Sequence, residues 1–220
     1  PTMSDQKPPD DPKTDDSLDL YRAKRTGGAT PEPMATSVTP ARGGPRVFVV
    51  HQHDTRRERL GEHRGRLALL AASAALTTVF AAPASQLQNE YLRTVKVENH
   101  PLEYVNFEAV IPAGNYGAGP MIAWDRGLFR PLIDPAQGMQ DGEIKFELYG
   151  YKLRGAFTLV HTGKGKRGRE SGRGSDHWLL IKKRDAPAEQ FLAAKQGLSE
   201  ASVLSGLTID ELASGAPRHQ

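Results

Sequence analysis

The chain has 220 residues, of which 38% are hydrophobic, 22 are glycine and 16 are proline. This length suits one domain of ordinary size with tails, and the glycine and proline content favours short strands and turns over long helices. Cysteine is absent, which excludes disulfides and thiolate zinc sites and fits a reducing cytoplasm. The net charge is only +3 at pH 7, so the total charge does not identify a partner.

The N-terminal part of the chain is polar and rich in turn-forming residues. Residues 1–18 contain many prolines and aspartates, and they predict a disordered tail without a secretory signal. Residues 19–45 are interpreted as an N-terminal arm and linker. A short helix is expected over Leu18–Arg25, with Ser17 as its N-cap. The TPEP segment at residues 30–33 is expected to be extended, because its prolines exclude a helix.

Residues 46–187 are interpreted as one β-rich domain. Short apolar or alternating segments between glycine turns predict strands, and many such strands indicate a barrel or sandwich. The strand candidates are Arg46–His53, Tyr91–Glu98, Phe107–Ile111, Pro120–Trp124, Glu143–Tyr149, Ala156–His161 and Trp178–Lys183. Residues 188–220 are expected to form a C-terminal helical tail, with short helices over Ala188–Lys195 and Ile209–Ala213.

The segment 58–91 is atypical for this domain. Within it, Leu67–Ala84 has no charged residue over 18 positions, which makes it a marginal candidate for a membrane span. Its alanine, serine and threonine content is weakly hydrophobic, and Pro83 interrupts it. We therefore expect a buried or partner-facing helix in this segment and no membrane partner.

A basic, glycine-rich run at residues 164–173 predicts contact with phosphate groups. Clustered positive charge is a better pointer to such a partner than the total charge. The alternative is a solvated loop that the charge keeps soluble. The candidate DNA-binding residues are Lys164, Lys166, Arg167, Arg169 and Arg173.

The stretch HPLEYVNFEAVIPAGNYGAGPMIAWDRG, residues 100–127, is the densest in chemically restrictive residues. Pro101 restricts the backbone of His100 to an extended conformation, and Glu98 is expected on the same strand face. A histidine, a carboxylate and the phenol of Tyr104 can together position a phosphate and a metal. The alternative is a surface histidine with a nearby acid. Farther upstream, His51 and His53 lie on one face of their strand and could ligate a metal.

Three glycines, Gly114, Gly117 and Gly119, indicate a tight turn inside this stretch. Such a turn can present backbone N–H groups to phosphate, or it can simply require positive φ angles. The spacing is not that of a dinucleotide-binding fingerprint, so a nucleotide cofactor is not expected.

This stretch closely resembles the signature of the 3′-phosphoesterase module of bacterial DNA ligase D. The resemblance covers about residues 20–57 and 92–215, and it includes the segments YRAKRTGGATPEP, RVFVVHQHD, GEIKFELYGYKLRGAFTLVHT, HWLLIKKRDAPA and SVLSGLTIDELASG. It implies a mainly β fold, a curved antiparallel β-barrel with short flanking helices. It also implies DNA 3′-end processing in repair by end joining, in which a divalent metal, typically manganese, serves removal of a 3′-terminal ribonucleoside and a 3′-phosphate.

Position by position, the resemblance implies catalytic roles for Arg25, Glu32, Glu98, His100 and Tyr104, and metal binding by His53 and His100. The implied partners are DNA 3′ ends, at primer-templates or breaks, and a DNA ligase or polymerase of the end-joining machinery. The implied location is the cytoplasm, in association with the nucleoid. The alternative is a catalytically impaired module that binds DNA ends or a partner and has lost part of its metal site.

The resemblance stops abruptly after Arg57. The family expects a His-Tyr-Asp-x-Arg-x-Glu motif that supplies a second histidine and an aspartate to the metal and an arginine to the phosphate. By spacing these three fall on Arg59, Gly61 and His63, which do not match. One hypothesis is a segment read out of frame between compensating insertions or deletions, and the other is divergence to a pseudo-enzyme. Resequencing the gene separates them, since a clean in-frame read of this sequence excludes a sequencing error.

Overall fold

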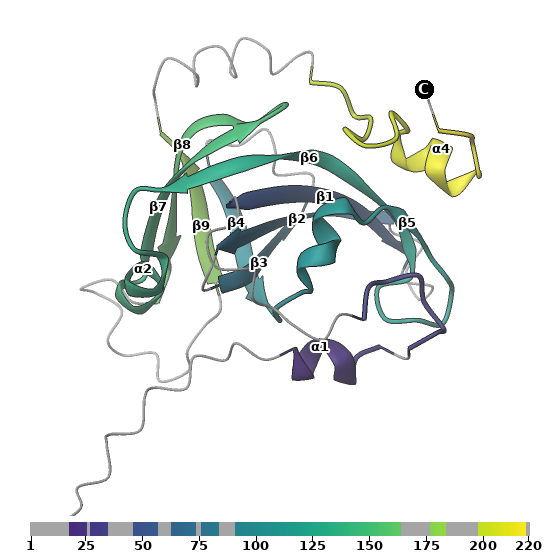
Figure 1. Cartoon of the computed structure of the whole chain (residues 1–220), viewed down its shortest axis with the longest axis horizontal. Coiled ribbons are helices and arrows are strands. Elements are labelled where there is room, and N and C mark those ends of the chain that lie inside the picture. The colour runs from purple at the N-terminus through teal and green to yellow at the C-terminus, as the bar shows by residue number, and fades with distance from the viewer. Residues whose placement is uncertain are drawn as a thin grey trace, which may run out of the picture.

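The fold is described from a computed structural model, which describes residues 18–25, 27–34, 46–56, 63–73, 76–83, 91–163, 177–183 and 198–218. These residues form one nine-stranded antiparallel sheet with short helices outside it (Figure 1). The strands are β1 (Val47–Arg56), β2 (His63–Ser73), β3 (Leu76–Pro83), β4 (Tyr91–Val97), β5 (Ala109–Ile111), β6 (Gly119–Pro131), β7 (Glu143–Gly150), β8 (Arg154–His161) and β9 (His177–Lys182). The helices are α1 (Asp19–Ala23), the 3₁₀ helix η2 (Leu102–Asn106), α2 (Pro135–Asp141) and α4 (Ile209–Ala213).

The sheet curls so strongly that β6, which is next to last in the strand order, also pairs with the first strand, β1. The strand order is β1-β2-β3-β4-β9-β8-β7-β6-β5, and β6 also pairs with β1. Strand β6 is long enough for both partners, because its Met121–Leu128 part faces β1 and its Gly127–Pro131 part faces β7. The expectation of a mainly β, curved antiparallel barrel with short flanking helices is therefore confirmed.

The helix expected within Leu67–Ala84 is wrong, because strands β2 and β3 cover this segment. Strand β2 pairs with β1 from Val47↔Ala72 to Arg56↔His63, and with β3 from Arg66↔Pro83 to Ser73↔Leu76. Alanine is the best helix former, but intrinsic propensity is a weak preference, and a ladder along the whole length of β1 outweighs it. Within the part of the chain that the structure describes, no helix is long and apolar enough to cross a membrane.

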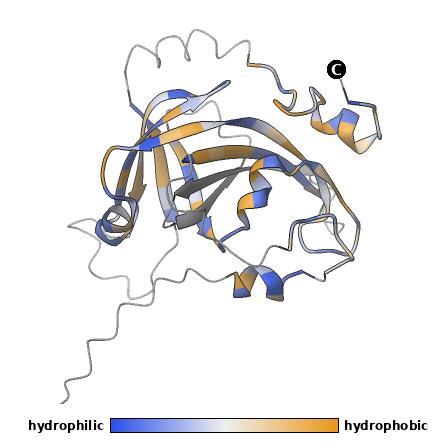
Figure 2. Cartoon of the chain, in the orientation of Figure 1, coloured by the Kyte–Doolittle hydropathy of each residue, from blue (hydrophilic) through white to orange (hydrophobic). Residues whose placement is uncertain are grey.

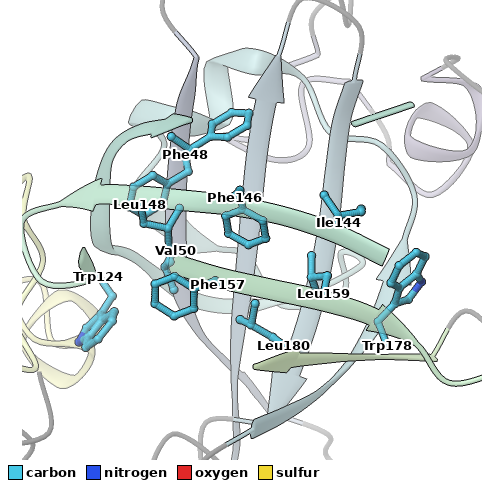
Figure 3. Packing of buried hydrophobic residues seen from close by; sticks show 11 residues of the cluster. Phe48, Val50, Trp124, Ile144, Phe146, Leu148, Phe157, Leu159, Trp178 and Leu180 are labelled. Carbon is cyan, nitrogen blue, oxygen red and sulfur yellow. The ribbon is translucent and has the colours of Figure 1, made fainter. Parts of the chain in front are cut away.

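One hydrophobic core fills the inside of the curled sheet. Phe48 and Val50 of β1 point into it together with alternate residues of β7, β8 and β9 (Figure 3). The rings of Phe146 and Phe157 stack there with centroids 6.1 Å apart. Alternation along β7 explains this packing, since Ile144, Phe146 and Leu148 are buried while the residues between them face outward.

A second hydrophobic cluster lies on the opposite face of β1. It begins with Val49 and includes residues of β6, of η2 and of the arm before β1. Leu18, which precedes α1, and Tyr21 within it are buried in this cluster, whereas Asp19 and Arg22 are exposed. Figure 2 accordingly shows hydrophilic and hydrophobic residues along this short helix. The N-terminal arm is therefore packed onto the barrel.

The C-terminal segment 198–218 also packs against the sheet. The Val203 N–H donates to the Ala123 carbonyl of β6 over 2.9 Å. The Ser202 hydroxyl donates to the Glu108 carboxylate, and Leu207 is 1% exposed. Helix α4 follows, with Thr208 and its Glu211 partner forming a capping box. The helix expected over Ile209–Ala213 is confirmed, whereas Ala188–Lys195 lies outside the described residues.

Candidate functional site

The N-terminal arm carries an arginine and a glutamate into the space beside η2. Helix α1 ends at Ala23, and Arg25 follows it with a side chain that is 5% exposed. Its Nε donates to Oε1 of Glu32 over 2.7 Å, and Glu32 is 4% exposed. Thr30 donates from its hydroxyl to the other oxygen, Oε2, over 2.9 Å. The TPEP segment thus places the buried carboxylate of Glu32 next to the guanidinium of Arg25.

Tyr104 of η2 completes this buried pair from a distant part of the sequence. Its hydroxyl donates to Oε1 of Glu32, and the ring is 2% exposed. Burial raises the pKa of Tyr104, so the phenol stays protonated and remains a donor at neutral pH. The 3₁₀ turn after Pro101 aims this side chain at the arm, and its amide closes the turn on the Pro101 carbonyl over 3.1 Å.

Glu98 and His100 lie in the loop between β4 and η2. The expectation that they share a strand face is wrong, because β4 ends at Val97, yet both still approach Arg25. Oε1 of Glu98 lies 3.5 Å from Nη1 of Arg25. The other Glu98 oxygen, Oε2, accepts from Nζ of Lys24 over 2.9 Å. Glu98 therefore bridges two neighbouring cations of the arm.

The protonation of His100 is set by its surroundings. Burial and the positive charge of Arg25 lower its pKa to about 4, so the ring is neutral at pH 7. Nδ1 lies 2.9 Å from the Glu98 carbonyl, which only accepts, so the proton is on Nδ1. The lone pair is then on Nε2, 3.5 Å from Nη2 of Arg25. A neutral imidazole with this tautomer can accept a proton or bind a metal through Nε2.

The charges in this cluster balance. Burial is the largest single effect on the pKa of Glu98 and raises it, but the hydrogen bond from Lys24, a backbone hydrogen bond and the charges of His100 and Lys24 together lower it below its usual value. The hydrogen bond to Glu98 in turn raises the pKa of Lys24. Two cations, Lys24 and Arg25, therefore face two carboxylates, Glu32 and Glu98, around a neutral histidine. A phosphate that enters needs a further positive charge beyond those already paired.

His53 lies at the edge of the cluster on β1. Its Nε2 donates to the Gly117 carbonyl over 2.8 Å, which links β1 to the glycine turn. His51 shares its strand face, as expected, but is 2% exposed and contacts the Phe107 carbonyl over 3.1 Å. Burial lowers the pKa of His51 to about 4, with smaller effects of His100 and His53. His51 is therefore a neutral residue of the second hydrophobic cluster.

The residues present do not complete a metal site in the described ranges. No group of three or more histidine, aspartate or glutamate side chains that could hold a metal ion occurs there. His53 and His100 are the two candidates that the sequence supplied, and positions 59 and 61, where the other ligands fall by spacing, lie outside the described residues, as does the side chain of His63. The five candidate DNA-binding residues between 164 and 173 also lie outside them.

Three residues of the cluster were not predicted from the sequence. Tyr21 packs its ring 3.8 Å from Cζ of Arg25, Lys24 binds Glu98, and Tyr116 covers both cations from the glycine turn. A signal existed for Tyr21, because in the helix expected over Leu18–Arg25 it would lie four residues before Arg25 and on the same face. No local signal connects Tyr116 to the arm.

A family model for the DNA Ligase D 3′-phosphoesterase domain matches residues 51–161, half of the chain. The chain belongs to this family. A multifunctional non-homologous end joining protein LigD of Pseudomonas aeruginosa is 44% identical over 97 residues, which cover 44% of this chain and 11% of that protein. The LigD protein of Mycolicibacterium smegmatis is 33% identical over 157 residues, covering 69% of this chain and 20% of that protein. A LigD protein of Mycobacterium bovis is 29% identical over 206 residues, covering 90% of this chain and 24% of that protein.

The chain thus spans less than a quarter of the length of these LigD relatives. Membership in the 3′-phosphoesterase family confirms the resemblance seen in the HPLEY and YGAG motifs. The roles of single residues are not part of that finding, and they rest on the geometry described above.

Tyr21 is predicted to stabilise the docked arm through its hydroxyl as well as its ring. The hydroxyl donates to the Pro33 carbonyl over 2.7 Å. Tyr21→Phe should weaken docking by about 0.5–1.5 kcal/mol, the net value of one such hydrogen bond. Hydrogen exchange of the Arg22 amide, which donates to the Leu18 carbonyl inside α1, would measure this. Tyr21→Leu should cost more because it also removes the ring beside Arg25, and equal effects of the two variants would contradict a role for the ring.

Proposed function

We propose that this chain processes DNA 3′ ends, removing a 3′-terminal ribonucleoside and a 3′-phosphate to leave a 3′-hydroxyl. Membership in the 3′-phosphoesterase family supports the reaction class. The observation that carries the proposal is the convergence of Arg25, Glu32, Glu98, His100 and Tyr104 from two segments more than 60 residues apart. Those are the residues to which the resemblance assigns the chemistry.

Each proposed step is a hydrolysis in which a water oxygen adds to phosphorus and the proton that the water loses ends on the leaving oxygen. The bond from phosphorus to the 5′ oxygen of the ribonucleoside breaks first, which leaves a 3′-phosphate, and the bond from phosphorus to the 3′ oxygen of the strand breaks second. Arg25 is placed to bind the non-bridging oxygens of the phosphate, because its guanidinium is fixed by Glu32 and Tyr21. His100 is neutral and holds its lone pair toward Arg25, so it can take or pass a proton at Nε2. Glu32 and Tyr104 act as positioning residues, because both are buried behind Arg25.

A divalent cation, expected to be manganese, belongs to the proposal because the paired charges of the cluster leave none to spare for a phosphate. When bound, such an ion polarises phosphoryl oxygens. His53 and His100 are the proposed ligands among the described residues, and two donors make a weak site. His100 has a single lone pair, on Nε2, so it either binds the ion or transfers a proton and does not do both at once. The small number of metal ligands in the described part of the chain favours a second candidate function. In that case the chain is a module that binds DNA ends, or a ligase or polymerase of end joining, without turnover. Either function would be exercised in the cytoplasm at the nucleoid.

The test is an end-processing assay on a primer-template with a labelled 3′-phosphate, with and without manganese. We expect release of inorganic phosphate that depends on manganese and falls by about 100-fold or more in His100→Ala, the usual contribution of a proton-transferring side chain. Tyr151→Ala is the matched control, since Tyr151 is 71% exposed in the turn between β7 and β8, which contribute nothing to the cluster. Absence of release while DNA binding persists would overturn the enzymatic proposal and support the binding module.

A further inference from the structure

The glycine turn between β5 and β6 is held firmly against the candidate site. Gly114, Gly117 and Gly119 have φ angles of +89°, +72° and +139°, which residues with side chains rarely adopt. Nδ2 of Asn115 donates to the Ala29 carbonyl of the arm over 3.1 Å. On the other side, the Gly117 carbonyl accepts from His53. The turn therefore joins the arm to β1 and fixes the residue between these two anchors, Tyr116.

Tyr116 presents an aromatic face at the rim of the cluster. Its ring centroid lies 5.0 Å from Nζ of Lys24 and 5.3 Å from Cζ of Arg25. Arg25 thus has two aromatic rings close to its guanidinium, since the Tyr21 ring centroid lies 3.8 Å from its Cζ. Tyr21 is completely buried, whereas Tyr116 is 50% exposed. The Tyr21 ring is therefore part of the interior of the fold. The Tyr116 ring leaves half of its surface accessible to a ligand that approaches Arg25 from solvent.

A nucleotide bound through its 3′-phosphate brings its own base to this position. Phosphate and base are attached to the same sugar, so a phosphate at Arg25 leaves the base one sugar away, at the rim of the site. Aromatic side chains bind bases of any sequence, because every base has a π-face. Stacking therefore suits a protein that processes DNA ends of any sequence, whereas hydrogen bonds to one base would restrict it.

We infer that Tyr116 stacks on the base of the 3′-terminal nucleotide and positions it while its phosphate occupies the cluster. This inference rests on the proposed function and adds to it the contact that holds the end of the strand. Lys24 lies beside the same ring, with a side chain that is 38% exposed and a charge that is already paired with Glu98. Tyr116 is a binding residue in this scheme and takes no part in proton transfer.

The experiment compares Tyr116 variants of the full chain on two kinds of DNA 3′ end. One end carries a normal 3′-terminal nucleotide with its 3′-phosphate, and the other carries an abasic sugar at that position. Tyr116→Ala should raise the KM, and the Kd in a binding assay, by roughly 5- to 100-fold on the normal end. On the abasic end the same variant should equal the wild type, because there is no base to stack. Tyr116→Phe should retain the wild-type values on both ends.

The outcomes separate this inference from a purely structural role. Equal losses on the normal and abasic ends would mean that Tyr116 acts only by covering Arg25 and Lys24, and would overturn stacking. Wild-type behaviour of Tyr116→Ala on the normal end would overturn it as well. If the wild type binds both ends but releases no phosphate, the proposed reaction fails, while the difference in Kd between the two ends still decides whether Tyr116 stacks. Tyr151→Ala is again the matched control and should leave both Kd values unchanged.

Discussion

Replacing Glu32 by alanine is expected to release the N-terminal arm from the barrel and to abolish the proposed phosphate release. Glu32 accepts hydrogen bonds from Arg25, Thr30 and Tyr104, and it is 4% exposed. Removing one member of a buried ion pair typically costs about 3–5 kcal/mol, because the remaining charge is buried without compensation. Arg25 would keep only its 3.5 Å contact with Glu98 among the carboxylates of the cluster. Its guanidinium would then turn toward water and leave the phosphate site.

Two measurements distinguish undocking of the arm from unfolding of the whole barrel. Trp124 and Trp178 lie in the inner core, so their fluorescence in urea reports global unfolding of the barrel. Tryptic cleavage after Arg22, Lys24 or Arg25 reports undocking of the arm alone. We expect cleavage to accelerate strongly in Glu32→Ala while the fluorescence transition moves less. Unchanged protection of the arm would contradict the importance of the pair.

The matched control is Glu147→Ala, which breaks an ion pair with Arg130 on the outer surface. The side chain of Arg130 in that pair is 62% exposed. Exposed pairs contribute little, because water solvates the separated charges well. Both the fluorescence transition and the tryptic cleavage of the arm should match the wild type. A large change in this control would mean that the loss in Glu32→Ala does not depend on burial.

Replacing Gly150 by alanine is expected to destabilise the whole barrel by about 3 kcal/mol or more. Gly150 ends β7 opposite Gly127 of β6, where the backbone lies close to the ring of Phe48. A methyl group here would overlap the Asp125 carboxylate and lie 2.7 Å from Cζ of Phe48 and 2.9 Å from the Leu153 carbonyl. Asp125 is fully buried and accepts from the amides of Lys152 and Leu153 over 3.0 and 2.8 Å. Displacing it therefore also breaks the turn between β7 and β8.

Urea unfolding followed by tryptophan fluorescence measures this loss. Gly27→Ala is the matched control, because no atom lies within 4 Å of the added methyl group and its φ is not in the left-handed region. That variant should keep the wild-type free energy of unfolding or gain slightly, since alanine restricts the unfolded chain. A Gly150→Ala protein as stable as Gly27→Ala would show that position 150 tolerates a side chain.

Local sequence signals determined much of this protein. Alternating residues fixed β7, β8 and β9 close to their expected bounds, because one face of each strand is buried. The glycines of the YGAG turn have the positive φ angles that their spacing predicted. Helix α2 was not predicted, although its signals are present: Asp134 caps it, Pro135 opens it and Gly142 ends it in the left-handed conformation.

Only the tertiary structure decided the path of residues 63–83 and the surroundings of Arg25. An alanine-rich segment becomes the hairpin β2–β3 because β1 offers it a full-length ladder, which no local pattern reveals. Arg25 meets Glu98, His100 and Tyr116 more than 70 residues away along the chain. The motifs indicated the candidate site residues. Contacts between distant segments decided that these residues converge on one guanidinium, because burying that charge requires partners which its own segment supplies only in part.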